Sequence, residues 1–505
     1  MLYSGTQCAA IDHAAVTDWG FAALDLMTRA GTAAFAALQR RWPAAQRLCI
    51  CAGVGNNAGD AYVVAELAQG QGLDVQVLQL AGRTLGGHAG VCQQRARSAG
   101  VDIVAIDADD LARAQRAVAA ADVVVDGLLG IGLRTAPRPL FAQLIGLLND
   151  CGQPVLALDV PSGLDADASA PFAEAVQATL TVTFVVDKVC LRTGIGAALA
   201  GAVQIASLGL PARLLQAPDG VPQTAFDASA LPPLAVNAYK HGRGHVVIVG
   251  GDHGMGGAVV LAAQAALRAG AGLVSVITRG PAIPALLARC PEVMAVDTAR
   301  WPAVLALLQR ATVVVCGPGL GQGPWGRTLF AQVLDHSGPR VFDADALNLL
   351  ATCTPTPQLG AAVLTPHSGE AARLLDGTSA AIERDRLASA QQLATRFAAT
   401  VVLKGPGSLV VDSHTRSLCP HGNPGMASAG MGDVLSGIVA AVVAQTLTSA
   451  STSTSAPDLH PAVAQAVAWH SAAADVAATA HSARALLASD VIAALPGLAA
   501  QAPGL

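Results

Sequence analysis

Short apolar runs alternate with longer stretches of helical character along the first part of the chain. Runs of about 4–8 apolar residues bounded by turn-forming residues predict buried strands. Strands that alternate with helices predict a parallel sheet joined by right-handed crossovers. The predicted strands are LCICAG at 48–53, LDVQVLQL at 73–80, VDIVAID at 101–107, DVVVDGLLG at 122–130 and PVLALDVPSG at 154–163.

The alternation stops over residues 208–234, which are rich in Pro and Ala and lack periodicity, as a linker would be. It resumes with the strand HVVIVGGDHG at 245–254 and a helical stretch at 256–272. We therefore predict two α/β domains, at 1–212 and 235–505, with 213–234 as the linker between them. Further strands are predicted at 273–278, 312–317, 340–345, 361–366 and 400–405.

Composition agrees with two domains of this class. A chain of 505 residues is too long for one ordinary domain. Hydrophobic residues make up 52% and aromatic residues only 3%, which is typical of an Ala- and Val-rich α/β protein rather than a membrane protein. The apolar run Val434–Ala444 is shorter than the roughly 20 residues that span a bilayer, so we expect a buried helix and no membrane partner.

Charge, the N-terminus and the cysteines exclude several function classes. A net charge of −5 without a basic run argues against nucleic-acid binding. The start, MLYSGTQCAAIDHA, lacks the basic and apolar regions of a secretory signal, so a cytoplasmic location is expected. The ten cysteines form no C-x-x-C pair, which argues against a zinc site or a disulfide framework and favours buried thiols. The run Thr446–Asp458, rich in Ser and Thr, predicts a surface loop.

The most informative segment is GNPGMASAGMGDVLSG at 422–437, where a glycine-rich turn runs into an apolar helix. Glycine lets the backbone approach a ligand closely, and the free amides at a helix start attract phosphate oxygens. Asp433 stands where a general base would be placed. The alternative is a tight strand-to-helix connection with Asp433 as a capping residue.

Polar residues also gather where strands of the first half end. GVGNNAGD, at 53–60, follows one strand and opens a helix, while Asp126 and Asp159 each end another strand. Open α/β sheets bind ligands at this edge, and side-chain oxygens there can hold a ligand or a hard cation. For each carboxylate alone, a helix cap or a strand-end turn is the alternative.

Three further positions carry two interpretations each. Lys188 can form a salt bridge or contact a phosphate. The carboxylates of Asp343 and Asp345 can hold Mg²⁺ through water or cap the next helix, and we favour a supporting role. Glu370 can contact metal-bound water or complete a cap in the first turn of the helix that follows. His367 can be a turn residue after Pro366.

These residues resemble one known family. GVGNNAGDA, DGLLGIG, LDVPSG and TFVVDK in the first half, with GPGLG, DADALNLL, LTPHSGE, VVLKGPGSLV and GNPGMASAGMGD in the second, are similar to the bifunctional NAD(P)H-hydrate repair enzymes. The resemblance covers nearly the whole chain. It implies an N-terminal Rossmann-like three-layer domain with NAD(P)HX epimerase activity. It also implies a C-terminal ribokinase-like three-layer α/β/α domain that dehydrates (S)-NAD(P)HX with ADP or ATP.

For the epimerase domain, the resemblance implies a K⁺ site at Asn57, Asp126 and Ser162. It implies that Asp159 is the acid/base residue for interconverting the two C6 epimers. The family usually has glycine where Ala58 and Ala61 stand, and a positive φ angle at Ala58 would be strained. The hydrated dinucleotide is expected against Asn56, Asn57, Ala58, Gly59, Asp60, Gly130, Ile131, Gly132, Leu133, Arg134, Thr135, Ala136 and Asp159.

For the dehydratase domain, the resemblance implies phosphorylation of the C6 hydroxyl of the hydrate, followed by elimination of phosphate. Asp433 would take the hydroxyl proton, and the amides of Gly430 and Gly432 would stabilise the transferring phosphoryl group. The nucleotide would lie against Lys404, Gly405, Pro406, Gly407 and Ser408, with Asn423 placing phosphate or Mg²⁺. The hydrate would contact Ala258, Gly319 or Leu320, His367 and Asp433.

The expected partners are therefore the small molecules NADHX, NADPHX and ADP, and we expect a homo-oligomer. Two other functions stay open at this point. A ribokinase-like small-molecule kinase would share the glycine-rich turn and Asp433, but would release a stable phosphorylated alcohol. A non-catalytic nucleotide-binding module would bind nucleotides or partners without turnover.

Overall fold

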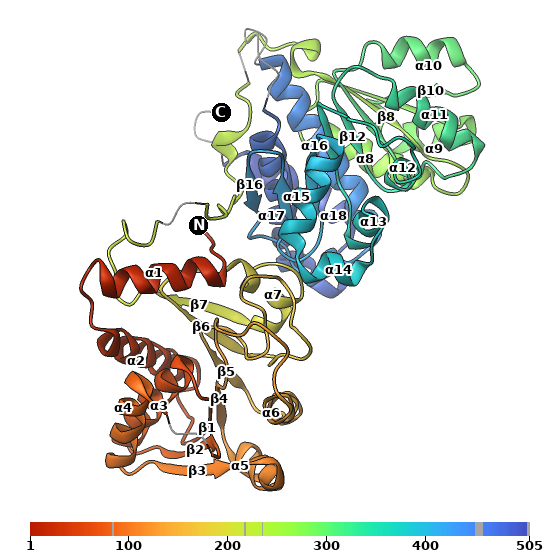
Figure 1. Cartoon of the computed structure of the whole chain (residues 1–505). Helices are drawn as coiled ribbons and strands as arrows, with labels where there is room; N and C mark the ends of the chain where they lie inside the picture. Colours follow the sequence, from red (N-terminus) through yellow and green to blue (C-terminus); the bar gives the residue numbers. More distant parts are fainter. Residues whose placement is uncertain (83–84, 217–218, 235, 450–457, 502–505) are drawn as a thin grey trace. The chain divides into compact units, whose positions relative to one another are not determined.

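The computed structural model describes residues 1–82, 85–216, 219–234, 236–449 and 458–501. The chain divides into two compact units, Met1–Val221 and Pro222–Leu505, inside the stretch that lacks periodicity (Figure 1). Residues just after the division pack within the second unit. Thr224 donates a backbone hydrogen bond of 2.9 Å to Leu418, and the Phe226 ring stacks on Trp469.

The first unit is built on a seven-stranded sheet in which every neighbouring pair is parallel. The strand order is β3-β2-β1-β4-β5-β6-β7, so the chain reverses its direction of travel across the sheet between β1 and β4. Such a switch point opens a crevice at the carboxyl ends of the two strands. The strands are β1 (Arg47–Ala52), β2 (Asp74–Leu80), β3 (Asp102–Ile106), β4 (Val123–Gly127), β5 (Val155–Leu158), β6 (Leu180–Phe184) and β7 (Ala202–Ala206). The predicted parallel sheet is confirmed.

Helices cover both faces of this sheet, with α2 and α3 on one face and α5 on the other. The first helix begins where the Ser4 hydroxyl accepts a hydrogen bond from the Gln7 amide, in a capping box. Tyr3, just before α1, forms a parallel bridge with Lys188, which follows β6, so the start of α1 lies beside the carboxyl end of that strand. The helices are α1 (Gly5–Thr17), α2 (Ala23–Arg41), α3 (Asn56–Gly70), α4 (Gly87–Ser98), α5 (Leu111–Ala120), α6 (Pro139–Asp150) and α7 (Gly194–Ala200).

The strain considered at Ala58 does not arise, because this residue lies in the first turn of α3 with an ordinary helical backbone. Its methyl group is fully buried in the domain core. Ala61, the other departure from glycine, packs against Gly127, where an added Cβ would come within 2.6 Å of the Ala61 Cβ. The two alanines are therefore accommodated by helix geometry and by the glycine opposite.

The second unit contains a nine-stranded sheet in the order β10-β9-β8-β11-β12-β13-β14-β15-β16. It is parallel except at one end, where β14, β15 and β16 pair antiparallel. The sequence pattern predicted β14 but not β15, β16 or their antiparallel pairing. The five residues from Lys404 to Ser408 are too few for a crossover helix, so the chain turns back as a hairpin. The strands are β8 (His245–Val249), β9 (Leu273–Thr278), β10 (Met294–Asp297), β11 (Val313–Cys316), β12 (Arg340–Phe342), β13 (Ala362–Leu364), β14 (Thr400–Leu403), β15 (Leu409–Val411) and β16 (Arg416–Leu418).

The helices of this unit form a layer on each face of its sheet. Helices α8 and α16–α18 share one core with the sheet, while α10 packs against β10, α11 against β11, and α15 against β14 and β15. The helices are α8 (Gly256–Arg268), α9 (Ile283–Arg289), α10 (Trp301–Leu308), α11 (Pro324–Leu334), α12 (Asp345–Leu350), α13 (Ser368–Leu374), α14 (Ser379–Arg384), α15 (Arg386–Phe397), α16 (Met431–Ser449), α17 (His460–His481) and α18 (Ala488–Ala499).

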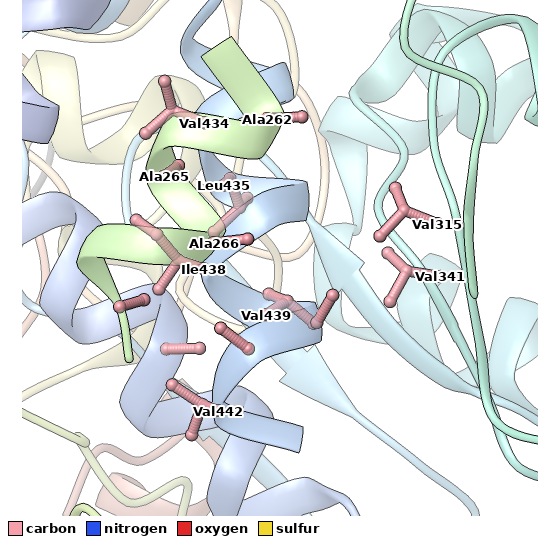
Figure 2. Packing of buried hydrophobic residues seen from close by; sticks show 14 of the residues in the cluster. Ala262, Ala265, Ala266, Val315, Val341, Val434, Leu435, Ile438, Val439 and Val442 are labelled. Carbon is pink, nitrogen blue, oxygen red and sulfur yellow. The ribbon is translucent and has the colours of Figure 1, made fainter. Parts of the chain in front are cut away.

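Helix α16 is the central element of that core. Its apolar residues lie between Ala262, Ala265 and Ala266 of α8 and the valines of β11 and β12 (Figure 2). The close approach of α8 requires glycine at Gly437, where a Cβ would come within 2.2 Å of the Ala262 carbonyl oxygen. The helix is long and apolar enough to cross a membrane, but 72% of its most apolar window is buried inside the unit. The predicted buried helix is confirmed.

Two smaller predictions have different outcomes. All ten cysteines are free and eight are buried, as expected. The predicted loop Thr446–Asp458 is wrong at its start, because α16 continues to Ser449 with its threonine hydroxyls bonded to backbone carbonyls one turn earlier. Residues 450–457 of that prediction lie outside the described residues.

Candidate functional sites

A cleft of ≈ 950 Å³ opens in the first unit at the carboxyl ends of β1, β4, β5 and β6. It lies at the switch point of the sheet. Ala58 and Gly59 do not line it, because Ala58 is fully buried in the domain core and Gly59 packs against Met27 of α2 and Ala89 of α4. The predicted substrate-binding residues that do line it are Asn56, Asn57, Asp60, Gly130, Ile131, Gly132, Leu133, Arg134, Thr135, Ala136 and Asp159.

Asp159 faces this cleft and is held by a buried lysine. The Lys188 ammonium donates to Asp159 Oδ1 at 2.7 Å and to Thr183 Oγ1 at 2.7 Å, and it also lies 3.1 Å from the Phe184 carbonyl oxygen. The Lys188 side chain is 1% exposed, whereas Asp159 is 13% exposed. Burial favours the neutral lysine, but the Asp159 carboxylate outweighs it and raises the pKa of Lys188. Of its two interpretations, Lys188 is therefore the salt-bridge lysine.

The backbone beside this ion pair is strained. Asp159 has φ 66° and Val185 has φ 67°, in the left-handed region that disfavours residues with a Cβ. Both residues line the cleft, and each follows a parallel strand. Such strain persists where surrounding contacts fix the conformation. Here the Phe184 amide also donates to Asp159 Oδ1 at 3.1 Å, so Asp159 and Lys188 together hold both turns.

Asn57, Asp126 and Ser162 come together beside the cleft, as the resemblance implied. Ser162 donates to Asp126 from its hydroxyl at 2.6 Å and from its backbone amide at 2.8 Å. Asn57 donates from Nδ2 to the Leu129 carbonyl oxygen at 2.8 Å, while its buried Oδ1 has no hydrogen-bond partner among the described residues. Burial raises the pKa of Asp126 to about 6, against the opposing hydrogen bonds. A cation would satisfy both the unpaired amide oxygen and the buried carboxyl group.

The sequence reasoning did not identify Asp12, which lies on α1 and lines the same cleft. Burial raises the pKa of Asp12 to about 6, with a further rise from Asp159 and an opposing effect of Lys188. Burial likewise raises the pKa of Asp60 well above its usual range, with Asp159 and Asp12 contributing. A single aspartate in an unremarkable helix carries no sequence signal, so only the placement of α1 reveals Asp12.

In the second unit, Asp433 lies in the first turn of α16, directly after the glycine-rich turn. Burial raises the pKa of Asp433 to about 7, the Asp343 carboxylate adds to the rise, and Lys404 opposes it. A carboxyl group with a pKa near neutrality is suited to general-base catalysis. Gly430 has φ 87°, and a Cβ there would come within 2.5 Å of Leu261, so this turn requires glycine.

Lys404 lies beside Asp433 and is fixed by carboxylates. Its ammonium donates to Asp343 Oδ1 at 2.7 Å and lies 3.7 Å from Glu370 Oε2. The side chain of Lys404 is 20% exposed, whereas Asp343 is 2% exposed and also accepts from Ser436 Oγ at 2.7 Å. Burial opposes the charge, yet the Asp343 and Glu370 carboxylates raise the pKa of Lys404. Gly432 packs over this pair, where an added Cβ would lie 3.3 Å from the Lys404 ammonium.

The two other carboxylates considered from the sequence have structural partners. Glu370 Oε2 accepts from the His367 amide at 2.9 Å in a capping box, so the cap interpretation is confirmed. Asp345 Oδ2 accepts from the Gly321 amide at 2.8 Å. Asp343 caps no helix here and instead anchors Lys404, which is a supporting role.

The loop Lys404–Ser408 rests on a buried arginine that sequence reasoning missed. Arg386 is 0% exposed and donates to the carbonyl oxygens of Leu403 and Lys404 at 3.2 and 3.1 Å. Gly405 packs on its guanidinium group, where a Cβ would come within 2.8 Å. The sequence signal for this arginine is the motif IERDR, in which Glu383 stands three residues before Arg386. In the structure Glu383 and Arg386 form an ion pair of 2.7 Å.

The remaining predicted residues divide into exposed and buried ones. Ala258 and Gly319 are neighbours, because a Cβ added at Gly319 would lie 3.3 Å from the Ala258 Cβ. Both residues are partly exposed. Leu320 is fully buried, so Gly319 is the one of the two that a ligand can reach. The side chain of His367 is 55% exposed. Asn423 is held by α17, because its Nδ2 donates to Asp475 Oδ1 at 2.9 Å.

The described residues contain no cluster of three His, Cys, Asp or Glu side chains able to hold a metal ion.

The comparison with known families matches a model described as NAD(P)H-hydrate dehydratase over residues 246–497 and one described as YjeF-related protein N-terminus over residues 23–190. Each match falls within one of the two units.

Individual proteins are similar as well. The bifunctional NAD(P)H-hydrate repair enzyme Nnr of Coxiella burnetii is 41% identical, with 97% of this chain and 98% of that protein covered. The counterpart of Escherichia coli is 40% identical over 94% of this chain and 89% of that protein. The crystal structure of a ribokinase-like superfamily protein from Enterococcus faecalis matches at 28% identity with a TM-score of 0.50, covering 57% of this chain and 98% of that one.

Proposed function

The chain belongs to the bifunctional NAD(P)H-hydrate repair enzymes, and from this premise we propose how its two domains divide the reaction. The N-terminal domain interconverts the R and S epimers of NAD(P)HX. The C-terminal domain dehydrates (S)-NAD(P)HX to NAD(P)H with ADP or ATP as co-substrate. The observation that carries the proposal is the placement of Asp433 beside Lys404 at the glycine-rich start of α16.

In the C-terminal domain, the oxygen of the C6 hydroxyl attacks the terminal phosphoryl group of the nucleotide. Asp433 accepts the proton of this hydroxyl. The amides at Gly430 and Gly432 and the Lys404 ammonium face the charge that develops on that group. Phosphate then leaves C6 far more readily than hydroxide would, as C5 loses a proton to water and the C5=C6 double bond of NAD(P)H forms. Lys404, Gly405, Pro406, Gly407 and Ser408 hold the nucleotide, and Ala258, Gly319 and His367 contact the hydrate.

In the N-terminal domain, the hydrated dinucleotide occupies the cleft at the carboxyl ends of the strands. Asp159 transfers a proton to or from the oxygen on C6, because its carboxylate is the partly exposed end of the ion pair with Lys188. The loop 130–136 and Asn56 border the dinucleotide. A volume of ≈ 950 Å³ is at the large end of small-molecule sites, which suits a dinucleotide.

K⁺ fits the group formed by Asn57, Asp126 and Ser162. The unpaired Asn57 Oδ1, the Asp126 carboxylate and the Ser162 hydroxyl are the hard oxygen donors that such an ion prefers. The bound cation would supply positive charge to a buried carboxyl group and fix the loop that follows β4. Mg²⁺ would accompany the nucleotide phosphates in the C-terminal domain. A homo-oligomer and a cytoplasmic location stay predictions.

The test is NADH formation, followed by its absorbance, from a mixture of both NADHX epimers with ADP and Mg²⁺. Wild-type protein should convert the whole mixture. Asp433→Asn should convert none of it, since a general base contributes about 10²–10⁴ in rate. Asp159→Ala should stop after the S epimer is consumed.

Two controls make the outcome specific. Asp335→Asn, at the end of α11, should behave as wild type because this exposed residue lies outside both sites. ATP with small-molecule alcohols such as hydroxymethylpyrimidine tests the kinase alternative. Accumulation of a stable phosphorylated alcohol without NADH formation would overturn the repair function in favour of that kinase.

A further inference from the structure

We propose that Asp12 is the proton donor of the epimerisation and works as a pair with Asp159. This inference rests on the proposed function of the N-terminal cleft. The Asp12 carboxyl group lines the cleft from α1, while Asp159 lines it from the end of β5. A nicotinamide ring bound between these two elements would present one face to each carboxyl group.

The reaction requires two such groups. The C6 hydroxyl of NAD(P)HX sits on the carbon next to the ring nitrogen N1, so the epimers interconvert when hydroxyl leaves one face and water returns to the other. Departure needs a proton, and addition needs a base on the opposite face. A single carboxylate held by Lys188 can serve one face of the ring.

Asp12 gives its proton to the C6 hydroxyl as the C6–O bond breaks, and the N1 lone pair forms an N1=C6 double bond while water leaves. A water molecule then attacks C6 from the other face and gives a proton to Asp159, as the double-bond electrons return to N1. The proton returns from Asp159 to Asp12 through cleft water, and the reverse reaction uses the two residues in exchanged roles.

The surroundings of Asp12 suit a group that holds its proton. No described residue forms a hydrogen bond or ion pair with its carboxyl group, whereas the Lys188 ammonium is 2.7 Å from Asp159. One carboxyl group is therefore partly buried without a partner among the described residues, and the other is held in an ion pair. Pairs of carboxyl groups separated in this way provide an acid and a base. The other titratable or charged residues that line the cleft are Cys8, His13, Asp60, Arg134, Arg138 and Lys188.

Asp60 is the rival for this role. It also lines the cleft and has no hydrogen-bond partner among the described residues, but it is 8% exposed and lies within α3. Asp12 is partly exposed on the cleft side of α1, so its proton can exchange with solvent between turnovers. We assign Asp60 to substrate binding and Asp12 to proton transfer.

The experiment measures interconversion of purified (R)- and (S)-NADHX by chromatography without ADP, so that the dehydratase domain is idle. Asp12→Asn should lower kcat by about 100-fold or more with KM nearly unchanged. Wild-type kcat/KM should fall as pH rises through the pKa of Asp12, and Asp12→Asn should lose this limb. Asp12→Glu should retain the limb at a reduced rate, and it carries the test if Asp12→Asn does not fold.

Two further variants serve as comparisons for Asp12→Asn. Asp18→Asn, at the exposed end of α1 and outside the cleft, should behave as wild type. Asp60→Asn should raise KM and keep the pH limb. The inference is overturned if Asp12→Asn keeps kcat within twofold, if it changes only KM, or if Asp60→Asn abolishes the limb instead. If wild-type protein does not interconvert the epimers, the proposed epimerase function fails rather than the role of Asp12.

Discussion

Each domain has an aspartate–lysine ion pair of 2.7 Å beside its site. The two pairs differ in which member is the more exposed one. In the first unit the lysine is buried and the Asp159 carboxylate faces the cleft. In the second unit Asp343 is buried and the Lys404 ammonium is the more exposed end. A carboxylate facing a ligand can move a proton, whereas an ammonium group can stabilise phosphate. In the proposed mechanism, the orientation of the pair therefore distinguishes the epimerase site from the phosphoryl-transfer site.

The strongest test of this comparison is Lys404→Met. We expect the kcat/KM of dehydration to fall by about 10²–10³, because the ammonium that stabilises the phosphoryl group is lost. The measurement is NADH formation from (S)-NADHX and ADP. The double variant Asp343→Asn with Lys404→Met should regain stability without regaining activity. Recovery of activity in the double variant would show that Lys404 is only structural.

Lys188→Met should act mainly on stability. Removing one partner of a buried ion pair costs about 3–5 kcal/mol, because the remaining charge is left unpaired. We expect amide hydrogen exchange in β5 and β6 to accelerate by the factor that corresponds to this loss of stability. Adding Asp159→Asn to Lys188→Met should restore most of the protection, while epimerisation stays lost. Unchanged exchange in Lys188→Met would contradict the interpretation of Lys188 as the structural end of its pair.

Replacing K⁺ with N-methylglucamine should sharpen the contrast between the domains. Epimerisation should slow by about 10–100-fold, the range found when groups that support a bound ion are lost. Dehydration of (S)-NADHX should not change. In Asn57→Leu, which lacks the unpaired amide oxygen, epimerisation should be slow with or without K⁺. A full K⁺ response in this variant would exclude Asn57 as a ligand.

The smallest expected effect is the pH dependence of dehydration. In the proposed mechanism the reaction needs the Asp433 carboxylate, and burial raises the pKa of this group to about 7. The kcat/KM should therefore fall about tenfold per pH unit below 7 and level off above it. Because Lys404 lowers the pKa of Asp433, Lys404→Met should move the midpoint to higher pH. A shift to lower pH would show that the two residues do not interact as described.

The pattern of apolar runs predicted most of the fold. Five strands of the first sheet and six of the second were placed from the sequence, because buried parallel strands read as continuous apolar runs. Short edge strands such as β10 and β16 were missed, since each has few residues and is partly exposed at one or more positions. Their position is set by the neighbouring strand rather than by their own residues.

The sequence by itself determined where ligand-binding groups stand along the chain. Glycines at strand-to-helix turns and polar residues at strand ends, such as Asn57 and Asp433, are local features of the kind that the backbone requires. The tertiary structure alone decided which groups are charged partners. Asp343 and Lys404 are far apart in sequence, and Asp12 reaches the cleft only because α1 packs beside the carboxyl ends of the strands. Burial and pairing set the pKa of a carboxyl group, and both depend on residues brought together by the fold.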